Sequence, residues 1–192
     1  MRCERADVGT CLLGLLTVLV LSAPLTAQIT RAGAEGPERT EIPEFRVVVP
    51  MEMHASQPVI EATVNGQGPF KFLFDTGAAG CGRITADLAK QLGLPEVGDV
   101  RVGDPRGRNS EMAKRVGIDT ITIGSATFRG IEILRRDYKE KIDVQRRGIG
   151  GILGFALFQD VVFTLDYPGR QLIIEKAPLP NSGDNLLPFT AE

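Results

Sequence analysis

A series of short segments rich in β-branched and aromatic residues constrains the fold more than any other feature of the sequence. From Phe45 onward these segments are FRVVVPM, PVIEATV, FKFLFD, RVGIDTITIG, TFRGIEIL, VVFTLDY and RQLIIEK. Val, Ile, Phe and Thr favour pleated, half-buried strands, and several of the segments alternate apolar and polar residues. The sequence therefore predicts a mostly β domain.

Turn-forming residues between these segments predict how neighbouring strands connect. NGQG at 65–68 and YPGR at 167–170 suit tight hairpins, and IGSAT at 123–127 suits a third. The stretch ITADLAKQLGLP, 84–95, is the one convincing helix, because Thr85 can cap it and a Gly and a Pro end it. FALFQDV, 155–161, fits either a second short helix or a buried strand.

The two ends of the chain differ from the domain between them. Residues 1–27 read as a signal peptide, because two arginines precede the apolar run CLLGLLTVLVL, which is too short to span a bilayer comfortably. An uncleaved N-terminal anchor is the alternative. Residues 28–44 are rich in Gly and Pro and read as a flexible linker or propeptide. We expect a folded domain at 45–178, a C-terminal tail at 179–192, and a periplasmic or secreted protein.

Composition narrows the classes of partner and cofactor. The formal net charge is -2 and the sequence contains no Trp. It therefore predicts neither a basic surface that would bind phosphates nor an aromatic surface on which bases would stack, and we expect no nucleic-acid partner. After signal cleavage only Cys81 would remain, beside the single His54. Two such residues cannot build a zinc site or an oriented Cys/His pair. We therefore expect no metal and no cofactor, and no membrane contact beyond the signal segment.

The stretch FKFLFDTGAAG, residues 70–80, places an ionisable side chain at the end of an apolar strand. Burying an unpaired carboxylate is costly, so Asp75 must find hydrogen-bond donors or be neutralised. Gly77 allows the backbone to approach that carboxylate closely, and Thr76 adds a hydroxyl. A carboxylate fixed in this way is suited to acid/base chemistry on water.

The order of motifs resembles that of retropepsin-like aspartic proteases, in particular the exported bacterial type with a single lobe. An apolar strand precedes DTGA, a helix ends in LGLP, and GGILGFALF is followed by VVFTLDYPGRQLIIEK. The resemblance extends from about Phe45 to Lys176. It implies a closed β-barrel with one or two short helices, and an aspartic endopeptidase that acts on peptides or proteins.

The resemblance also assigns roles around the DTG motif. Asp75 matches the catalytic aspartate, and Thr76 matches the residue whose hydroxyl grips the equivalent loop of the partner lobe. Gly77 matches the glycine whose amide supports the carboxylate. Ala78 lacks the hydroxyl that pepsin-like members carry at this position, which implies that activity peaks at mildly acidic rather than strongly acidic pH. Ala79 lacks the polar side chain that is common at the next position.

A second motif lies downstream. Ile152, Leu153 and Gly154 match the hydrophobic-hydrophobic-glycine element that packs behind the catalytic loop. Gly150 stands where exported bacterial relatives often carry Asp. Residues 100–115 fall where such proteins place the flap, a hairpin that closes over substrate.

The sequence contains only one DTG, whereas this chemistry needs two carboxylates that share one proton. Asp119 and Asp166 are followed by other residues, in DTI and DYP. A two-fold homodimer would supply the second Asp75. Three alternatives stay open: a lobe that pairs with a different protein in a bilobal architecture, a non-catalytic peptide-binding or assembly module, and an unrelated small-ligand β-barrel.

Overall fold

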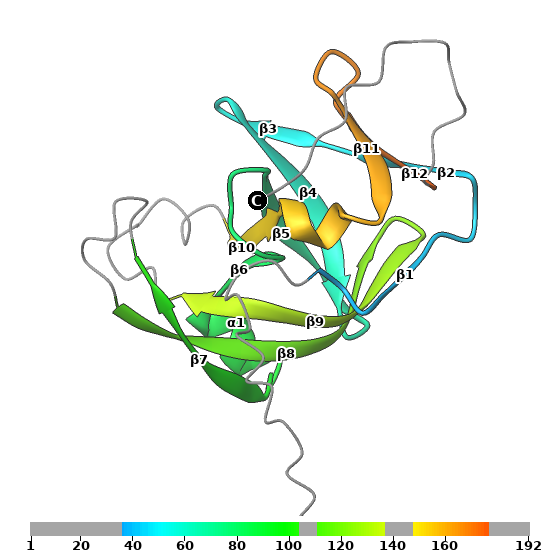
Figure 1. Cartoon of the computed structure of the whole chain (residues 1–192). Coiled ribbons are helices and arrows are strands. Elements are labelled where there is room, and N and C mark those ends of the chain that lie inside the picture. Colours follow the sequence, from blue (N-terminus) through cyan, green and yellow to red (C-terminus); the bar gives the residue numbers. More distant parts are fainter. Residues whose placement is uncertain (1–35, 104–110, 137–147, 177–192) are drawn as a thin grey trace, which may run out of the picture. The chain divides into compact units, whose positions relative to one another are not determined.

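Strands dominate the structure, a computed structural model that describes residues 36–103, 111–136 and 148–176 (Figure 1). The helices α1 and η1 are both short. The elements are β1 (Arg39–Glu41), β2 (Arg46–Pro50), β3 (Glu52–His54), β4 (Gln57–Val64), β5 (Gln67–Asp75), β6 (Gly82–Thr85), α1 (Ala86–Gln91), β7 (Glu96–Val102), β8 (Glu111–Ile123), β9 (Ala126–Arg136), β10 (Ile149–Gly154), η1 (Phe155–Phe158), β11 (Val161–Asp166) and β12 (Gln171–Lys176). The predicted mostly β class is confirmed.

The larger sheet closes on itself. Its strand order is β1-β9-β6-β10-β5-β4-β8-β7, and β8 pairs with β9 as well as with β4. The strands β9, β6, β10, β5, β4 and β8 therefore form a ring. Within it β10 runs parallel to β5, and β6 runs parallel to β9. The parallel pair of β10 and β5 brings two motifs that are distant in sequence to the same level of the sheet.

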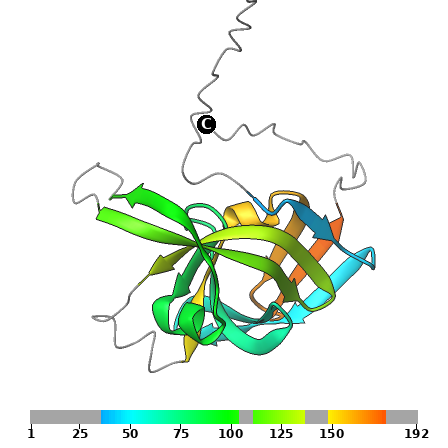
Figure 2. The same cartoon turned by 90° about the horizontal axis from the view of Figure 1, so that it is seen from below.

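A smaller sheet of β11, β12 and β2 lies beside this ring and shares its core. Figure 2 shows the three strands next to one another, with β12 between its two antiparallel partners. Alternating residues of β2 are buried, Val47 and Val49 among them, while Val48 points outward. Burial of one face in this way is what the period of two in a strand provides.

Aromatic side chains connect the small sheet to the strand that carries Asp75. The ring centroids of Phe74 and Phe158 lie 5.0 Å apart, and those of Phe74 and Phe163 lie 5.2 Å apart. Phe158 also contacts Phe128 of β9, at 5.3 Å. Such tilted and edge-to-face pairs add to the burial of apolar area. The residue directly before Asp75 is therefore fixed in the core, where it is 5% exposed.

The three predicted hairpins are confirmed. Strand β4 turns into β5 through Asn65 and Gly66, whose φ angles of 49° and 73° suit the mirror-image turn that hairpins favour. Strands β8 and β9 are joined after the pair Ile123 and Ala126, and β11 and β12 after the pair Asp166 and Gln171. Local turn chemistry was sufficient to predict these connections.

Both predicted helical segments are also helical in the structure. The Thr85 hydroxyl accepts a hydrogen bond from the Leu88 amide at 3.2 Å and caps α1. Leu88 is buried on the inner face of this helix. The segment that fitted either a helix or a strand forms η1, a short 3₁₀ helix over Phe155–Phe158.

The assignment of 28–44 to a linker is wrong for its second half. Residues 39–41 form β1, which pairs with β9, and Ile42 is only 8% exposed. Glu41 accepts hydrogen bonds from Arg129 of β9 at 3.0 and 3.2 Å. A strand of three residues gives no periodic signal, and its stability comes from the edge of β9. Residues 28–35, the signal segment and the tail from 179 lie outside the described residues.

Candidate active site

Asp75 is the last residue of β5. Phe72 and Phe74 hold the strand in the core, with exposures of 0% and 5%, whereas Asp75 and Thr76 are exposed. The Gly77 amide donates to the Asp75 carboxylate Oδ1 at 2.9 Å, and the Ala78 amide donates to the Asp75 carbonyl at 3.0 Å. The backbone turn therefore orients the carboxylate through the Gly77 amide, as expected for this glycine, but the carboxylate is exposed rather than buried.

The hydrophobic-hydrophobic-glycine element lies directly behind this turn. In the parallel pairing of β10 with β5, Gly154 is opposite Asp75 and Leu153 is opposite Phe74. The Gly154 amide donates to the Cys81 carbonyl at 2.9 Å, so β10 also holds the far side of the loop. Leu153 is fully buried. The structure thus brings together the two motifs that the sequence placed far apart.

Gly154 is required because any side chain here would clash with neighbouring backbone, not because of its own backbone angles. Its φ of -97° and ψ of 169° are open to any residue. A Cβ at this position would lie 2.5 Å from the Gly80 carbonyl oxygen and 2.7 Å from that of Ala78. Both atoms belong to the backbone of the loop that follows Asp75, so a side chain here would displace that loop.

Gly150 has a similar explanation. A Cβ on Gly150 would lie 2.5 Å from Cδ2 of Leu88 on α1. An aspartate at this position would need that leucine side chain to move. The close contact is with the end of a leucine side chain, so a small side chain here would require a change in how Leu88 packs.

Cys81 lies in the loop after Asp75 and is only 1% exposed. Burial raises the pKa of its thiol to about 12. Because the thiolate is the reactive form of cysteine, this thiol is a poor nucleophile at neutral pH. Within the described ranges no group of three His, Cys, Asp or Glu side chains could hold a metal ion.

A hairpin lies where the flap is expected, and its role as a flap stays a prediction. Strands β7 and β8 pair antiparallel from Val102 and Glu111 to Glu96 and Val116. Ion pairs strengthen this hairpin, with Lys114 Nζ 2.9 Å from Asp99 and 3.5 Å from Glu96. Residues 104–110 between the strands lie outside the described residues.

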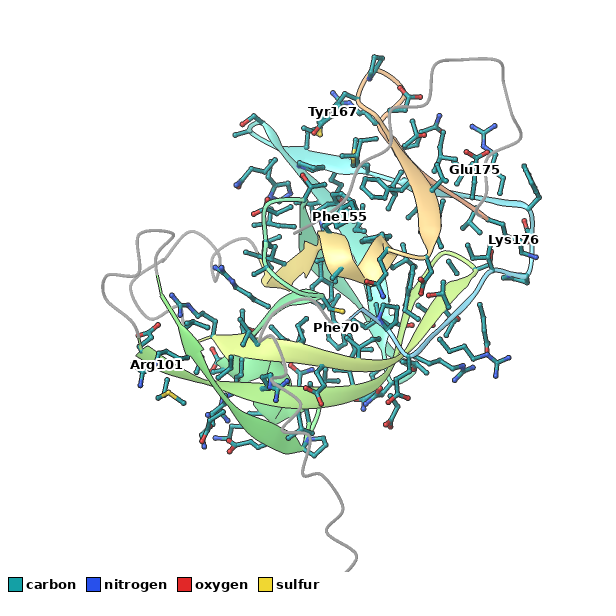
Figure 3. The ribbon with its side chains drawn as sticks, viewed as in Figure 1. Phe70, Arg101, Phe155, Tyr167, Glu175 and Lys176 are labelled. Carbon is teal, nitrogen blue, oxygen red and sulfur yellow. The ribbon has the colours of Figure 1, made fainter. Side chains whose placement is uncertain are left out.

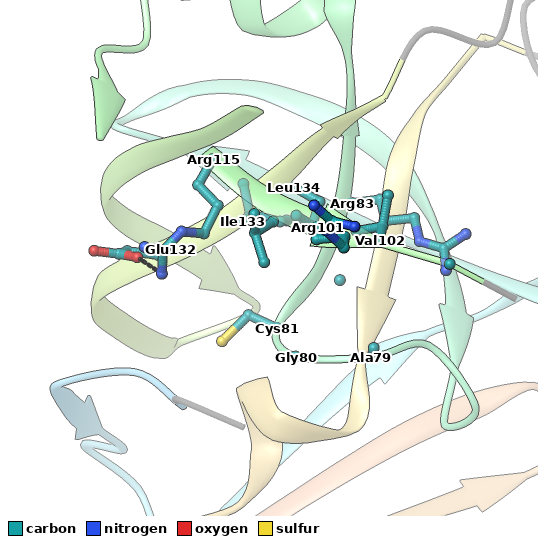
Figure 4. A pocket seen from close by; sticks show the side chains of 13 residues that line it. Ala79, Gly80, Cys81, Arg83, Arg101, Val102, Arg115, Glu132, Ile133 and Leu134 are labelled. Carbon is teal, nitrogen blue, oxygen red and sulfur yellow. Dashed lines mark ion pairs between the residues drawn. The ribbon is translucent and has the colours of Figure 1, made fainter. Parts of the chain in front are cut away.

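A cavity of about 250 Å³ separates this hairpin from the loop that follows Asp75. Figure 4 shows Ala79, Gly80 and Cys81 on one side of it and Arg115 and Ile133 on the other. Its charged lining residues are Arg83, Arg101, Arg115 and Glu132. Sequence reasoning missed this cavity, because these residues come from β6, β7, β8 and β9 and meet only through the pairing of those strands.

The surface near the site also carries an exposed aromatic residue. Phe155, labelled in Figure 3, follows Gly154 directly and is 45% exposed. Its ring centroid lies 6.3 Å from that of Phe163.

In the part of the chain that the structure describes, no helix has the length and apolar character to cross a membrane.

One family model matches the sequence, and two solved structures are similar to the chain. The family model described as aspartyl protease matches residues 60–157, just over half of the chain. A retropepsin-like aspartic protease from Rickettsia conorii is similar at 21% identity, with 72% of this chain and 94% of that chain covered and a TM-score of 0.48. An aspartic proteinase from Irpex lacteus is similar at 13% identity, with 74% of this chain and 50% of that chain covered and a TM-score of 0.41. No curated protein matches the sequence.

The matched region includes the whole turn at Asp75 and ends just after Gly154. It therefore contains both motifs that the parallel pairing of β5 and β10 brings into contact. On these grounds the chain belongs to the aspartyl protease family and is a peptidase.

Proposed function

We propose that this protease is an endopeptidase that works as a homodimer, with Asp75 of each copy contributing one of two catalytic carboxylates. The observation that carries the proposal is the state of Asp75 in the single chain. Its carboxylate is oriented by the Gly77 amide at 2.9 Å and is exposed at the end of a core strand. The sequence contains no second DTG that could complete the site.

Two such carboxylates would divide the chemical work. Like charges about 3 Å apart do not both ionise, so the pair holds one proton between them. The ionised group takes a proton from the attacking water, and the protonated group donates to the carbonyl oxygen of the scissile bond. A two-fold axis through the site gives both carboxylates the same surroundings.

The surroundings of Asp75 support this arrangement. Thr76 is exposed next to it and is free to contact the equivalent loop of a second copy. Ala78 is buried, and Gly154 packs against its carbonyl from behind. The loop is therefore supported on its inner side and open on the side where a second copy would lie.

The proposal is tested by replacing Asp75 with Asn. We expect cleavage of a random peptide library to fall by at least about 10²-fold, because acid/base groups contribute that much or more. Asp119→Asn is the matched control, since Asp119 is also exposed and also precedes a Thr. A statine-type transition-state mimic should block cleavage by the unsubstituted chain. Undiminished cleavage by the Asp75→Asn chain would remove Asp75 from the mechanism, and no cleavage by any form would favour the non-catalytic module.

Export of the protein is also a proposal, and it rests on the apolar run at residues 11–21. Mass spectrometry of protein from the native host should find a mature N-terminus at Gln28. A chain that keeps residues 1–27 and stays with the membrane would instead support the N-terminal anchor.

A further inference from the structure

We propose that the cavity beside the loop of Asp75 receives an acidic side chain of the peptide substrate. The inference rests on the proposed function, because it names the class of substrate that the same site would take. Its position is the first argument. Ala79 lines the cavity and is four residues from Asp75, a separation of at most about 14 Å. An extended peptide bound at Asp75 can therefore reach the cavity with a side chain a few residues from the scissile bond.

The lining of the cavity carries more positive than negative charge. Arg83, Arg101 and Arg115 line the cavity with a single carboxylate, that of Glu132. Glu132 is engaged by Arg115, at 2.5 Å between Oε2 and Nη1. Among the described residues, neither of the other two arginines has a carboxylate within ion-pair distance. The cavity thus has an excess of two positive charges.

Unsatisfied donors are the third argument. The Nε atoms of Arg83 and Arg115 are buried and have no hydrogen-bond partner among the described residues. Buried polar atoms in native proteins are nearly always hydrogen-bonded to protein or to water, so each of these two donors is open to a water or a ligand oxygen. A carboxylate is the partner that matches the planar fork of a guanidinium.

The apolar part of the lining is the fourth argument. Val102, Ile133 and Leu134 contribute to the walls, and the cavity holds several times the roughly 30 Å³ that one water occupies in the liquid. Such walls accept the methylene groups of Glu or Asp and strengthen ion pairs by lowering the local dielectric constant. The neutral Cys81 thiol adds no negative charge to the loop side.

The test measures binding separately from cleavage. Fluorescent peptides are paired so that they differ only by Glu or Gln at one position, and the position is moved along the sequence. Affinities are measured with the Asp75→Asn chain, which retains the cavity. At one position we expect Glu to bind at least about tenfold more tightly than Gln, as hydrogen bonds to charged groups provide. Raising the salt from about 0.05 M to about 0.5 M should reduce this preference.

Substitutions of single arginines show whether the cavity causes the preference for Glu over Gln. Arg101→Met removes a charge but keeps an unbranched side chain, and in the Asp75→Asn background it should reduce the preference to about twofold or less. Arg39→Met is the control, because Arg39 is an exposed arginine of β1 that does not line the cavity. We expect the control to keep the full preference.

The outcomes separate the two proposals. Equal affinity for Glu and Gln at every position would overturn the inference, as would a preference that survives Arg101→Met combined with Arg83→Met. Binding of no peptide at all would overturn both the inference and the proposed function. A preference for Glu without cleavage by the unsubstituted chain would refute the proposed function and leave the acidic site standing.

Discussion

Replacing Gly154 with Ala tests whether β10 holds the Asp75 loop in shape. The new Cβ would lie 2.5 Å from the Gly80 carbonyl oxygen and 2.7 Å from that of Ala78. Real Cβ contacts are essentially never shorter than 3.0 Å, so the loop must move by about 0.5 Å or more. Both contacts are with backbone, and no side chain can rotate to relieve them. The backbone angles of Gly154 suit alanine, so space alone sets the cost.

Gly154→Ala should reduce both the folding stability and the activity. Overpacking of this kind costs about 1–3 kcal/mol of folding free energy. In a chain of this length that corresponds to a fall in Tm of about 2–12 °C. Misplacement of a catalytic group by about 1 Å can reduce the rate by about 10²-fold. We expect the loss of activity to exceed what the loss of stability explains.

The assay compares thermal unfolding and peptide cleavage for two variants. Gly117→Ala is the control, because its Cβ would meet two side-chain atoms and no backbone. These are a methyl group of Val97 at 3.1 Å, which belongs to a 44% exposed side chain able to shift, and Cγ of Pro95 at 3.7 Å, an ordinary contact. We expect the control to keep its Tm and activity. If Gly154→Ala also kept both, the idea that β10 supports the Asp75 loop would be refuted.

Two further predictions follow from titratable groups outside the Asp75 turn. The first concerns Cys81 in a chain with Cys3 and Cys11 replaced by Ser. Its thiol should react with a thiol reagent at pH 8 at least about 10²-fold more slowly in the native than in the unfolded protein, because burial raises its pKa to about 12. Equal rates would show that the thiol is accessible. The Gly169 amide, followed by the Gln171 side chain, lowers the pKa of Asp166 below its ordinary 3.8. The carboxylate therefore stabilises the β11–β12 turn above pH 3.8, and this contribution is lost as the pH falls through the lowered pKa. Asp166→Asn should lower Tm at pH 7 and should lower it much less at a pH below the lowered pKa of Asp166. A Tm difference between the two proteins that is the same at every pH would contradict this account.

Features that depend on local sequence were predictable. The hairpin turns and the cap at Thr85 rest on residues within a few positions of each other, and the structure contains them. The contact between Gly154 and the Asp75 loop is long-range, and the sequence indicated it only because the order of motifs resembles a known family. The pairing of β10 with β5 supplies the physical reason for that order.

Features that depend on strand pairing were not predictable. Strand β1 has three residues in a segment rich in Gly and Pro, and its partner β9 begins 85 positions after its own end. The arginines of the cavity are Arg83, Arg101 and Arg115, and their spacing along the sequence has no period that indicates a shared site. They meet because β6, β8 and β9 lie side by side in the ring and β7 extends from β8.

Mixing active and inactive subunits tests most directly whether two copies of Asp75 form one site. Unsubstituted and Asp75→Asn chains are combined in equal amounts, allowed to exchange subunits, and assayed at constant total protein. If each site needs both carboxylates, random pairing leaves about one quarter of the activity of the unsubstituted protein. Retention of about one half would mean that each chain acts alone, and the shared site would be contradicted.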